Sequence, residues 1–227
     1  MLISVVIPAR NEEENIVSTV KNLEEKLKGL AHETIIVDDH STDKTMEKAK
    51  NLIQNYHSLK LISNTEKPGF AQALWTGFRA AKGEGVVVMM ADACDDPETI
   101  PAMVGKFLEG YDLICGSRYL KGGRKEGGPK LQGFFSLLVN KILHLFLRVP
   151  TTDASNAFKL YRRSLLTKIK TREEGFALSL ELALKFWRRG YKITDVPTYW
   201  KGRVAGKSKF RFGSAFISYG RQIFPFF

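Results

Sequence analysis

Residues 86–100 read Val-Val-Val-Met-Met-Ala-Asp-Ala-Cys-Asp-Asp-Pro-Glu-Thr-Ile, and this stretch sets the predicted fold. Its first five residues are apolar and follow a glycine-containing turn, which is typical of a short buried strand. Because ligands bind outside the carboxyl ends of the strands in an open α/β sheet, we expect Asp92, Asp95 and Asp96 at the rim of a ligand crevice. Carboxylate oxygens on a short turn suit Mg²⁺ or Mn²⁺ that carries a phosphorylated substrate.

The same turn can also be interpreted as the start of a helix. Asp96 would be the N-cap and Pro97 would occupy the first helical position, where each residue type is common. We expect both interpretations to hold, with Asp95 and Asp96 capping the helix and Asp92 facing the metal.

Strands and helices alternate through the first half of the sequence. Further strands are predicted at 2–8, 34–39 and 59–62, and helices are predicted to begin near Asn11, Ser41 and Ala71. This alternation predicts the α/β class, with a mostly parallel, Rossmann-like sheet between helices. The second strand also ends in carboxylates, Asp38 and Asp39, which suit hydrogen bonds from a base or ribose. Since no Walker loop or Gly-x-Gly-x-x-Gly follows the first strand, we expect a metal to neutralise the phosphates.

The composition is that of a folded globular protein, with 44% hydrophobic and 26% charged residues, and it excludes a disordered chain. The 35 Lys and Arg against 24 Asp and Glu give a net charge of +11, which favours an anionic partner such as a nucleotide, a lipid phosphate or a membrane surface. Two cysteines form no disulfide framework, no signal peptide precedes the first strand, and polar residues interrupt the apolar run 131–147. We therefore expect a cytoplasmic protein without a transmembrane helix.

The second half contains further predicted strands at 112–116, 157–161 and 191–197. Between the first two, segment 121–128 is rich in glycine and charge and is predicted to be a mobile loop. The loop is either inert or a phosphate lid that orders on binding, with the cations Lys121, Arg124, Lys125 and Lys130. The apolar stripe within 131–147 is either core or a helix in a membrane interface, and basic residues at its flanks favour the second interpretation.

Two later segments complete the prediction. Residues 176–189 form a predicted amphipathic helix in which Glu181 lies among leucines, and an acid in such surroundings should be paired or active. Segment 206–227 interleaves phenylalanine and tyrosine with basic residues, which suits a membrane surface.

Several motifs, spread in order over nearly the whole chain, give it a family resemblance. Three lie in the first half, Val5-Val-Ile-Pro-Ala-Arg-Asn-Glu12, Val37-Asp-Asp-His-Ser-Thr-Asp43 and Gly69-Phe-Ala-Gln-Ala73. With the Asp92 turn, they resemble the inverting family-2 glycosyltransferases of GT-A fold. Three more, Gly116-Ser-Arg-Tyr119, Thr152-Asp-Ala-Ser-Asn-Ala-Phe-Lys159 and Arg203-Val-Ala-Gly-Lys-Ser-Lys209, resemble the dolichyl- or polyprenyl-phosphate mannose synthase branch.

The resemblance implies a nucleoside-diphosphate sugar as donor. It implies a GT-A catalytic domain over 1–205, with 206–227 as an additional segment. Contacts to the donor are implied for Pro8, Arg10, Glu12, Asp39 and Asp92. The sequence departs from the family at the metal: Met90 stands at the first place of the usual Asp-x-Asp, and Cys94 stands at the next position on the metal side. Asp92 and, less directly, Cys94 are the expected ligands of Mg²⁺ or Mn²⁺.

The resemblance also implies a polyprenyl phosphate acceptor at the cytoplasmic face of a membrane. Asp153 is the implied base or acceptor-orienting residue, and Arg118 acts beside it in catalysis. The phosphate clamps and acceptor contacts are expected at Arg124, Glu181, Arg203 and Lys209. We expect hexose transfer with inversion, from GDP-mannose as the first choice; the alternative is a UDP-sugar with a saccharide or other soluble acceptor. Nucleic acid is not an expected partner, because it would explain the charge and none of the motifs.

Overall fold

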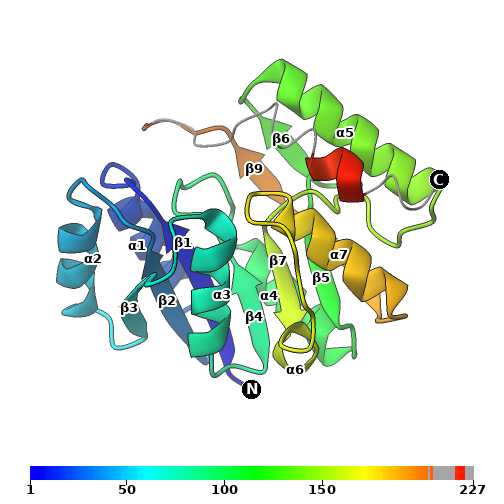
Figure 1. Cartoon of the computed structure of the whole chain (residues 1–227). Coiled ribbons are helices and arrows are strands. Elements are labelled where there is room, and N and C mark those ends of the chain that lie inside the picture. The colour runs from blue at the N-terminus through cyan, green and yellow to red at the C-terminus, as the bar shows by residue number, and fades with distance from the viewer. Residues whose placement is uncertain (204, 207–217, 223–227) are drawn as a thin grey trace.

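The computed structural model describes residues 1–203, 205–206 and 218–222. Seven strands form one sheet in the order β3-β2-β1-β4-β7-β5-β8 (Figure 1). Their bounds are β1 (Ile3–Ala9), β2 (His32–Asp38), β3 (Leu59–Ser63), β4 (Gly85–Val88), β5 (Leu113–Ser117), β7 (Lys159–Arg162) and β8 (Ile193–Pro197). All neighbouring strands are parallel except β7, which is antiparallel to β4 and β5. The predicted α/β class with a mostly parallel sheet is confirmed.

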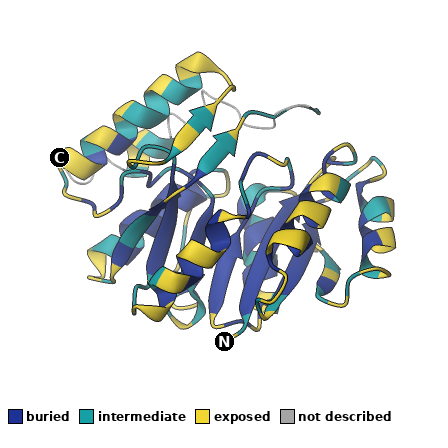
Figure 2. Cartoon of the chain, turned by 180° about the vertical axis from the view of Figure 1, so that it is seen from behind, coloured by how far each residue is buried: buried dark blue, intermediate teal, exposed yellow. Residues whose placement is uncertain are grey.

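Helices cover both faces of this sheet, and each face has its own buried apolar cluster. The helices are α1 (Ile16–Lys26), α2 (Thr45–Ile53), α3 (Phe70–Ala80), α4 (Thr99–Leu108), α5 (Lys130–Leu145), α6 (Arg163–Leu166) and α7 (Leu178–Arg188). α1, α2 and α4 pack on one face, and α3, α6 and α7 on the other. Figure 2 shows the strands buried between helices whose outer sides are exposed. Gly77 lets α3 approach β1 closely, since a Cβ there would collide with Val6.

A second, smaller layer lies at the carboxyl ends of the parallel strands. It contains α5 and a pair of parallel strands, β6 (Arg124–Glu126) and β9 (Tyr199–Lys201), as Figure 1 shows. The prediction of a loop over 121–128 was therefore wrong at 124–126, because these residues pair with β9 as a strand. In the described residues no helix has the length and apolar character needed to cross a membrane.

The turn after β4 also differs from the prediction. α4 begins at Thr99 and has no side-chain cap, so Asp96 is not its N-cap. The Asp96 carboxylate instead accepts a hydrogen bond from the backbone N–H of Glu98 at 3.0 Å, which closes a turn ahead of the helix.

A charged cluster at the other end of the sheet makes stability depend on pH. The Glu24 carboxylate accepts hydrogen bonds from Thr34 and Ser58 and contacts the His32 ring nitrogen at 3.2 Å. Burial raises the pKa of Glu24, but the bonds from His32, Ser58 and Thr34 outweigh it, and the net pKa is lowered. The bond to Glu24 raises the pKa of His32 above its ordinary 6.5, although burial opposes it.

These shifts predict the pH range in which the pair stabilises the fold. The His32 contribution is complete below pH 6.5 and is lost as pH rises through the raised pKa; the Glu24 contribution is present above pH 4.5 and is lost in acid. His32→Gln is expected to lower the free energy of unfolding by about 1–2 kcal/mol near pH 5.5 and by less at pH 8.5. Urea unfolding at both pH values measures the free energy of unfolding, and a substitution of an exposed histidine, His57→Gln, is the control. An equal loss of stability in His32→Gln at both pH values would contradict the prediction.

Candidate active site

A cavity of about 1850 Å³ opens at the carboxyl ends of the parallel strands. Of the residues predicted from the sequence, its lining includes Pro8, Arg10, Glu12, Asp39, Asp92, Cys94, Arg118, Glu181 and Arg203. Asp153 and Arg124 are not part of the lining, and Lys209 lies outside the described residues. The fold thus brings residues from both halves of the chain to one cavity.

Three neighbouring strands end in turns that contain a left-handed residue. These are Asn11 after β1, His40 after β2 and Ala93 after β4, with φ angles of 49°, 58° and 59°. Asparagine tolerates this conformation, whereas alanine adopts it only when the surrounding structure imposes it. The Ala93 turn is therefore a strained feature of the cavity rim, directly beside Asp92.

Hydrogen bonds within the turn hold Asp92 in place. The Asp95 carboxylate accepts a bond from the backbone N–H of Met90 at 3.0 Å, and Asp92 Oδ1 accepts one from the N–H of Cys94 at 3.2 Å. Burial, and then the charge of Asp92, raises the pKa of Asp95 to about 7. Burial likewise raises the pKa of the Cys94 thiol, so a neutral thiol faces this site and is a poor ligand for a hard cation.

Asp39 fixes the opposite side of the rim. The residue is buried, and its carboxylate accepts bonds from the Asn64 amide at 2.7 Å and from the backbone N–H of Gly69 at 3.0 and 3.1 Å. Gly69 immediately precedes α3, so Asp39 ties the end of β2 to the start of that helix.

Arg203 joins two of the predicted donor-side carboxylates. Its Nη1 and Nη2 donate to Glu12 at 3.0 and 2.9 Å, and Nη2 also lies 3.1 Å from Asp92 Oδ2. Burial lowers the pKa of Arg203, but the bond to Glu12 and the charge of Asp92 outweigh this effect. The net pKa is raised, so the guanidinium stays cationic. A fixed positive charge therefore lies between the two carboxylates.

The residues present fit a hydrated Mg²⁺ or Mn²⁺ and do not form a complete metal cage. Within the described ranges, no three or more His, Cys, Asp or Glu side chains are arranged to hold a metal. Magnesium is commonly held by one or two carboxylates while substrate phosphates and waters complete its shell. Asp92 can be such a carboxylate, but its Oδ2 is already paired with Arg203.

Competition between Arg203 and a metal leads to a prediction. Arg203→Gln is expected to raise the affinity for Mn²⁺ alone about tenfold, because a metal no longer has to displace a charge-assisted hydrogen bond from Asp92. Electron paramagnetic resonance of free Mn²⁺, without nucleotide, measures the affinity. Arg10→Gln removes another cavity-lining arginine as control. Equal Mn²⁺ affinity for the two variants would show that Arg203 does not compete.

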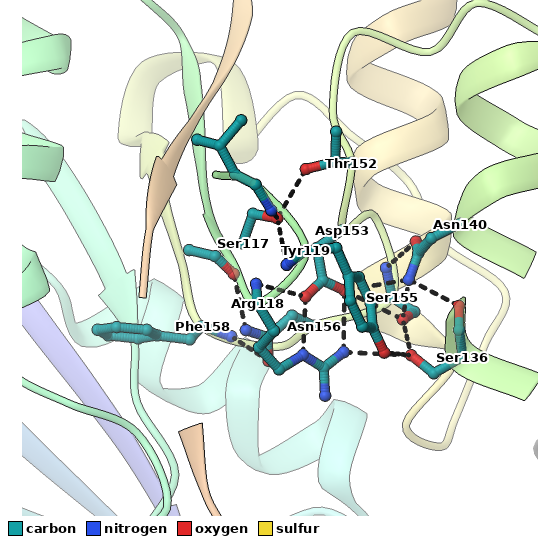
Figure 3. Close-up of polar contacts among 12 residues, drawn as sticks. Ser117, Arg118, Tyr119, Ser136, Asn140, Thr152, Asp153, Ser155, Asn156 and Phe158 are labelled. Atoms are coloured by element: carbon teal, nitrogen blue, oxygen red, sulfur yellow. Dashed lines mark hydrogen bonds and ion pairs between the residues drawn. The ribbon is translucent and has the colours of Figure 1, made fainter. Parts of the chain in front are cut away.

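A second polar centre lies where β5 ends (Figure 3). Arg118 donates to Asp153 through Nε at 2.7 Å and Nη2 at 2.9 Å, and its backbone N–H donates to the same carboxylate at 3.1 Å. Asp153 is fully buried. Burial lowers the pKa of Arg118, but the Asp153 charge and hydrogen bond raise it, and the net pKa is raised. The pair therefore holds a permanent guanidinium at the cavity wall.

Side chains from α5 complete this centre, and the sequence analysis missed them. Asn140 donates to Asp153 at 3.1 Å and to Ser155 at 2.9 Å. Ser136 accepts bonds from Arg118 Nη2 at 3.2 Å and from the Tyr119 hydroxyl at 3.0 Å. A signal was available, since both residues are uncharged polar interruptions, four positions apart, of a largely apolar stripe.

Glu181 is paired, which is one of the two outcomes expected for it. The residue is buried on α7, and its carboxylate accepts bonds from the backbone N–H groups of Arg172 and Glu173 and from the Lys185 ammonium. These contacts fix segment 172–175, which lines the cavity together with Glu181.

Comparison with known proteins agrees with this geometry. Residues 4–170 match the model of glycosyl transferase family 2. The chain belongs to this family. Over 227 residues it is 34% identical to a dolichol-phosphate mannosyltransferase of Pyrococcus furiosus, covering 99% of this chain and 63% of the relative. It is also 27% identical to the glycosyltransferase AglD of Haloferax volcanii, covering 97% of this chain and 36% of that protein. The chain thus spans less than two thirds of the length of each.

Similarity to solved structures confirms the predicted GT-A fold. A glucosyl-3-phosphoglycerate synthase from Mycobacterium tuberculosis, in complex with Mn²⁺, UDP and glucosyl-3-phosphoglycerate, has a TM-score of 0.73. The match covers 97% of this chain and 77% of that one, at 24% identity. The same enzyme with Mn²⁺, UDP and phosphoglyceric acid also has a TM-score of 0.73, at 22% identity.

Proposed function

We propose that the protein transfers a hexose, mannose from GDP-mannose as first choice, from a nucleoside-diphosphate sugar to a polyprenyl or dolichyl phosphate, with inversion. The observation that carries the proposal is that one cavity joins the carboxylates at the strand ends to Arg118 and to Phe135 and Val139 of α5. A nucleotide suits the first part, an acceptor phosphate the second and an isoprenoid chain the third. Similarity to the Pyrococcus dolichol-phosphate mannosyltransferase supports this choice of acceptor.

The donor side would act mainly by binding and positioning. Pro8, Arg10 and Glu12 line the cavity beside the nucleotide, and Asp39 lies at the end of β2, where base or ribose contacts are expected. We propose Asp92 as the protein ligand of Mg²⁺ or Mn²⁺, with Cys94 a weaker choice because its thiol is neutral. When bound, the metal would neutralise charge on the leaving diphosphate.

The acceptor side needs positive charge more than it needs a base. A phosphate monoester is already ionised at neutral pH, so the nucleophile has to be held in line rather than deprotonated. The Asp153 carboxylate is fully buried and accepts bonds from Arg118 and Asn140. We therefore propose that Asp153 acts by orienting Arg118, and that Arg118 contacts the acceptor phosphate.

A membrane surface is the proposed location, at its cytoplasmic face. α5 exposes Leu131, Phe134, Leu138 and Leu145, and Phe146 directly after the helix is exposed too. Exposed residues are visible along this helix in Figure 2. The basic residues Lys130, Lys141 and Arg148 are also exposed. An apolar stripe flanked by cations suits an interface of anionic lipids.

A soluble, phosphorylated acceptor with a UDP-sugar is the second candidate. The cavity lining also includes Arg172, Lys185 and Arg188, which suits a multiply charged acceptor. Purified protein with Mg²⁺ or Mn²⁺ and a short polyprenyl phosphate should be offered GDP-mannose, UDP-glucose and UDP-N-acetylglucosamine in parallel. Metal-dependent transfer from one donor to the lipid would support the first proposal; transfer only to soluble acceptors would favour the second.

A further inference from the structure

Strand β6 presents two neighbouring cations to opposite sides. Arg124 faces outward: its side chain is 70% exposed, it pairs with Glu126 at 2.8 Å, and its guanidinium lies 5.4 Å from the Tyr199 ring centroid. Lys125 lines the cavity. This alternation is the ordinary consequence of strand geometry, in which successive side chains point to opposite faces.

The structure makes room for Lys125 at the cavity wall. Its register partner on β9 is Trp200, which also lines the cavity, and the ammonium lies 5.4 Å from the Trp200 ring centroid. A Cβ at position 133 of α5 would overlap the ammonium, so glycine there leaves room for the end of the lysine side chain in this position. Gly128, with φ of 74°, likewise leaves space for the Trp200 ring. The lysine is therefore packed into the site and is not free on the surface.

The Lys125 charge lacks a counterion in this position. In the described part of the chain, the ammonium has no hydrogen-bond or ion-pair partner besides the face of Trp200. Burial, and then the nearby charge of Arg118, lowers the pKa of Lys125, although Asp153 opposes the shift. Two cations that repel each other in a half-buried cavity are stabilised when an anion binds between them.

We infer that Lys125 is the second cation of the acceptor site and binds the acceptor phosphate together with Arg118. This inference rests on the proposed function. The sequence indicates both Arg124 and Lys125 for a phosphate lid and Arg124 for an acceptor contact, whereas only Lys125 of the two lines the cavity. The diphosphate of the donor would bind in the same cavity and is the alternative ligand for Lys125. The position of Lys125, between Trp200 and the Gly133 turn of α5, favours the acceptor, because α5 also supplies Ser136 to Arg118.

The test compares Lys125→Gln, Lys125→Arg and Arg124→Gln in the full chain. Farnesyl phosphate is titrated calorimetrically, and farnesol serves as a probe with the same tail and no phosphate. Lys125→Gln is expected to weaken farnesyl phosphate binding about ten- to hundredfold and to leave farnesol unchanged. Lys125→Arg should recover most of the affinity, and Arg124→Gln should stay within twofold of the wild type.

Steady-state kinetics shows whether Lys125 binds the acceptor phosphate or the donor diphosphate. Lys125→Gln should raise KM for the acceptor and leave KM for the nucleotide sugar unchanged. A variant that binds farnesyl phosphate as the wild type does, or that loses donor affinity instead, would overturn the assignment while leaving the proposed function standing. Wild-type protein that binds no farnesyl phosphate would overturn the proposed function and the assignment together.

Discussion

Asp92→Asn is expected to reduce kcat/KM for sugar transfer about 10²–10³-fold. The reason is that Asp92 is the one carboxylate at the tip of the β4 turn that lines the cavity, and an amide neither balances a divalent cation nor retains the ion pair with Arg203. The measurement is initial-rate transfer at saturating Mn²⁺, with the melting temperature as a check on folding.

Asp96→Asn provides the matched control in the same turn. Asp96 accepts a hydrogen bond from the N–H of Glu98, an interaction that an asparagine oxygen can keep, and Asp96 does not line the cavity. Its kcat/KM should remain within twofold of the wild type. If Asp92→Asn were as active as Asp96→Asn, the metal and diphosphate would have to bind elsewhere.

Asp153→Asn is expected to cause the second large effect, on stability and transfer together. The amide would leave Arg118 without its buried counterion and would point its NH2 group at the N–H groups of the guanidinium. The loss of the buried pair costs about 3–5 kcal/mol. For a domain of this size, about 2–4 °C is lost per kcal/mol, so the melting temperature should fall by on the order of 10 °C. Transfer measured at low temperature, where the variant is folded, should still be strongly reduced because Arg118 is no longer oriented.

Asp112→Asn is the control for this variant. Asp112 pairs with Arg162 at 2.7 Å, at the opposite end of β5 from the cavity, and both side chains are partly exposed. Asp112→Asn should lower the melting temperature less than Asp153→Asn does, and it should leave kcat unchanged. An Asp153→Asn variant with unchanged melting temperature would contradict the orienting role.

The sequence predicts the central strands well because they are buried on both faces. β1, β2 and β4 each contain an apolar run, with polar residues a few positions later, and each was predicted to within about two residues at either end. Segment 157–161 was recognised as a strand, but its antiparallel direction in β7 depends on its neighbours in the sheet and leaves no local signal. β6 has only Arg-Lys-Glu, without an apolar pattern, and forms because β9 pairs with it.

The sequence predicted the site residues that lie at strand ends. It predicted less well the residues that come together only through contacts between separate helices, strands and loops. Asp39 directly follows β2 and Asp92 lies in the turn after β4, so the sheet positions both at the cavity. Which of Arg124 and Lys125 faces the cavity depends on the register of β6 against β9, and the sequence does not predict this strand. Asn140 approaches Asp153 only because α5 folds over the end of the sheet.

The most direct test of the central claim is a competition between acceptors. Purified protein, GDP-mannose and Mn²⁺ are incubated with equal amounts of farnesyl phosphate and phosphoglyceric acid, and the products are identified by mass spectrometry. The account predicts that the lipid phosphate gains one hexosyl unit and that this product disappears in Asp92→Asn. Hexosylation of phosphoglyceric acid, with farnesyl phosphate left unchanged, would contradict it.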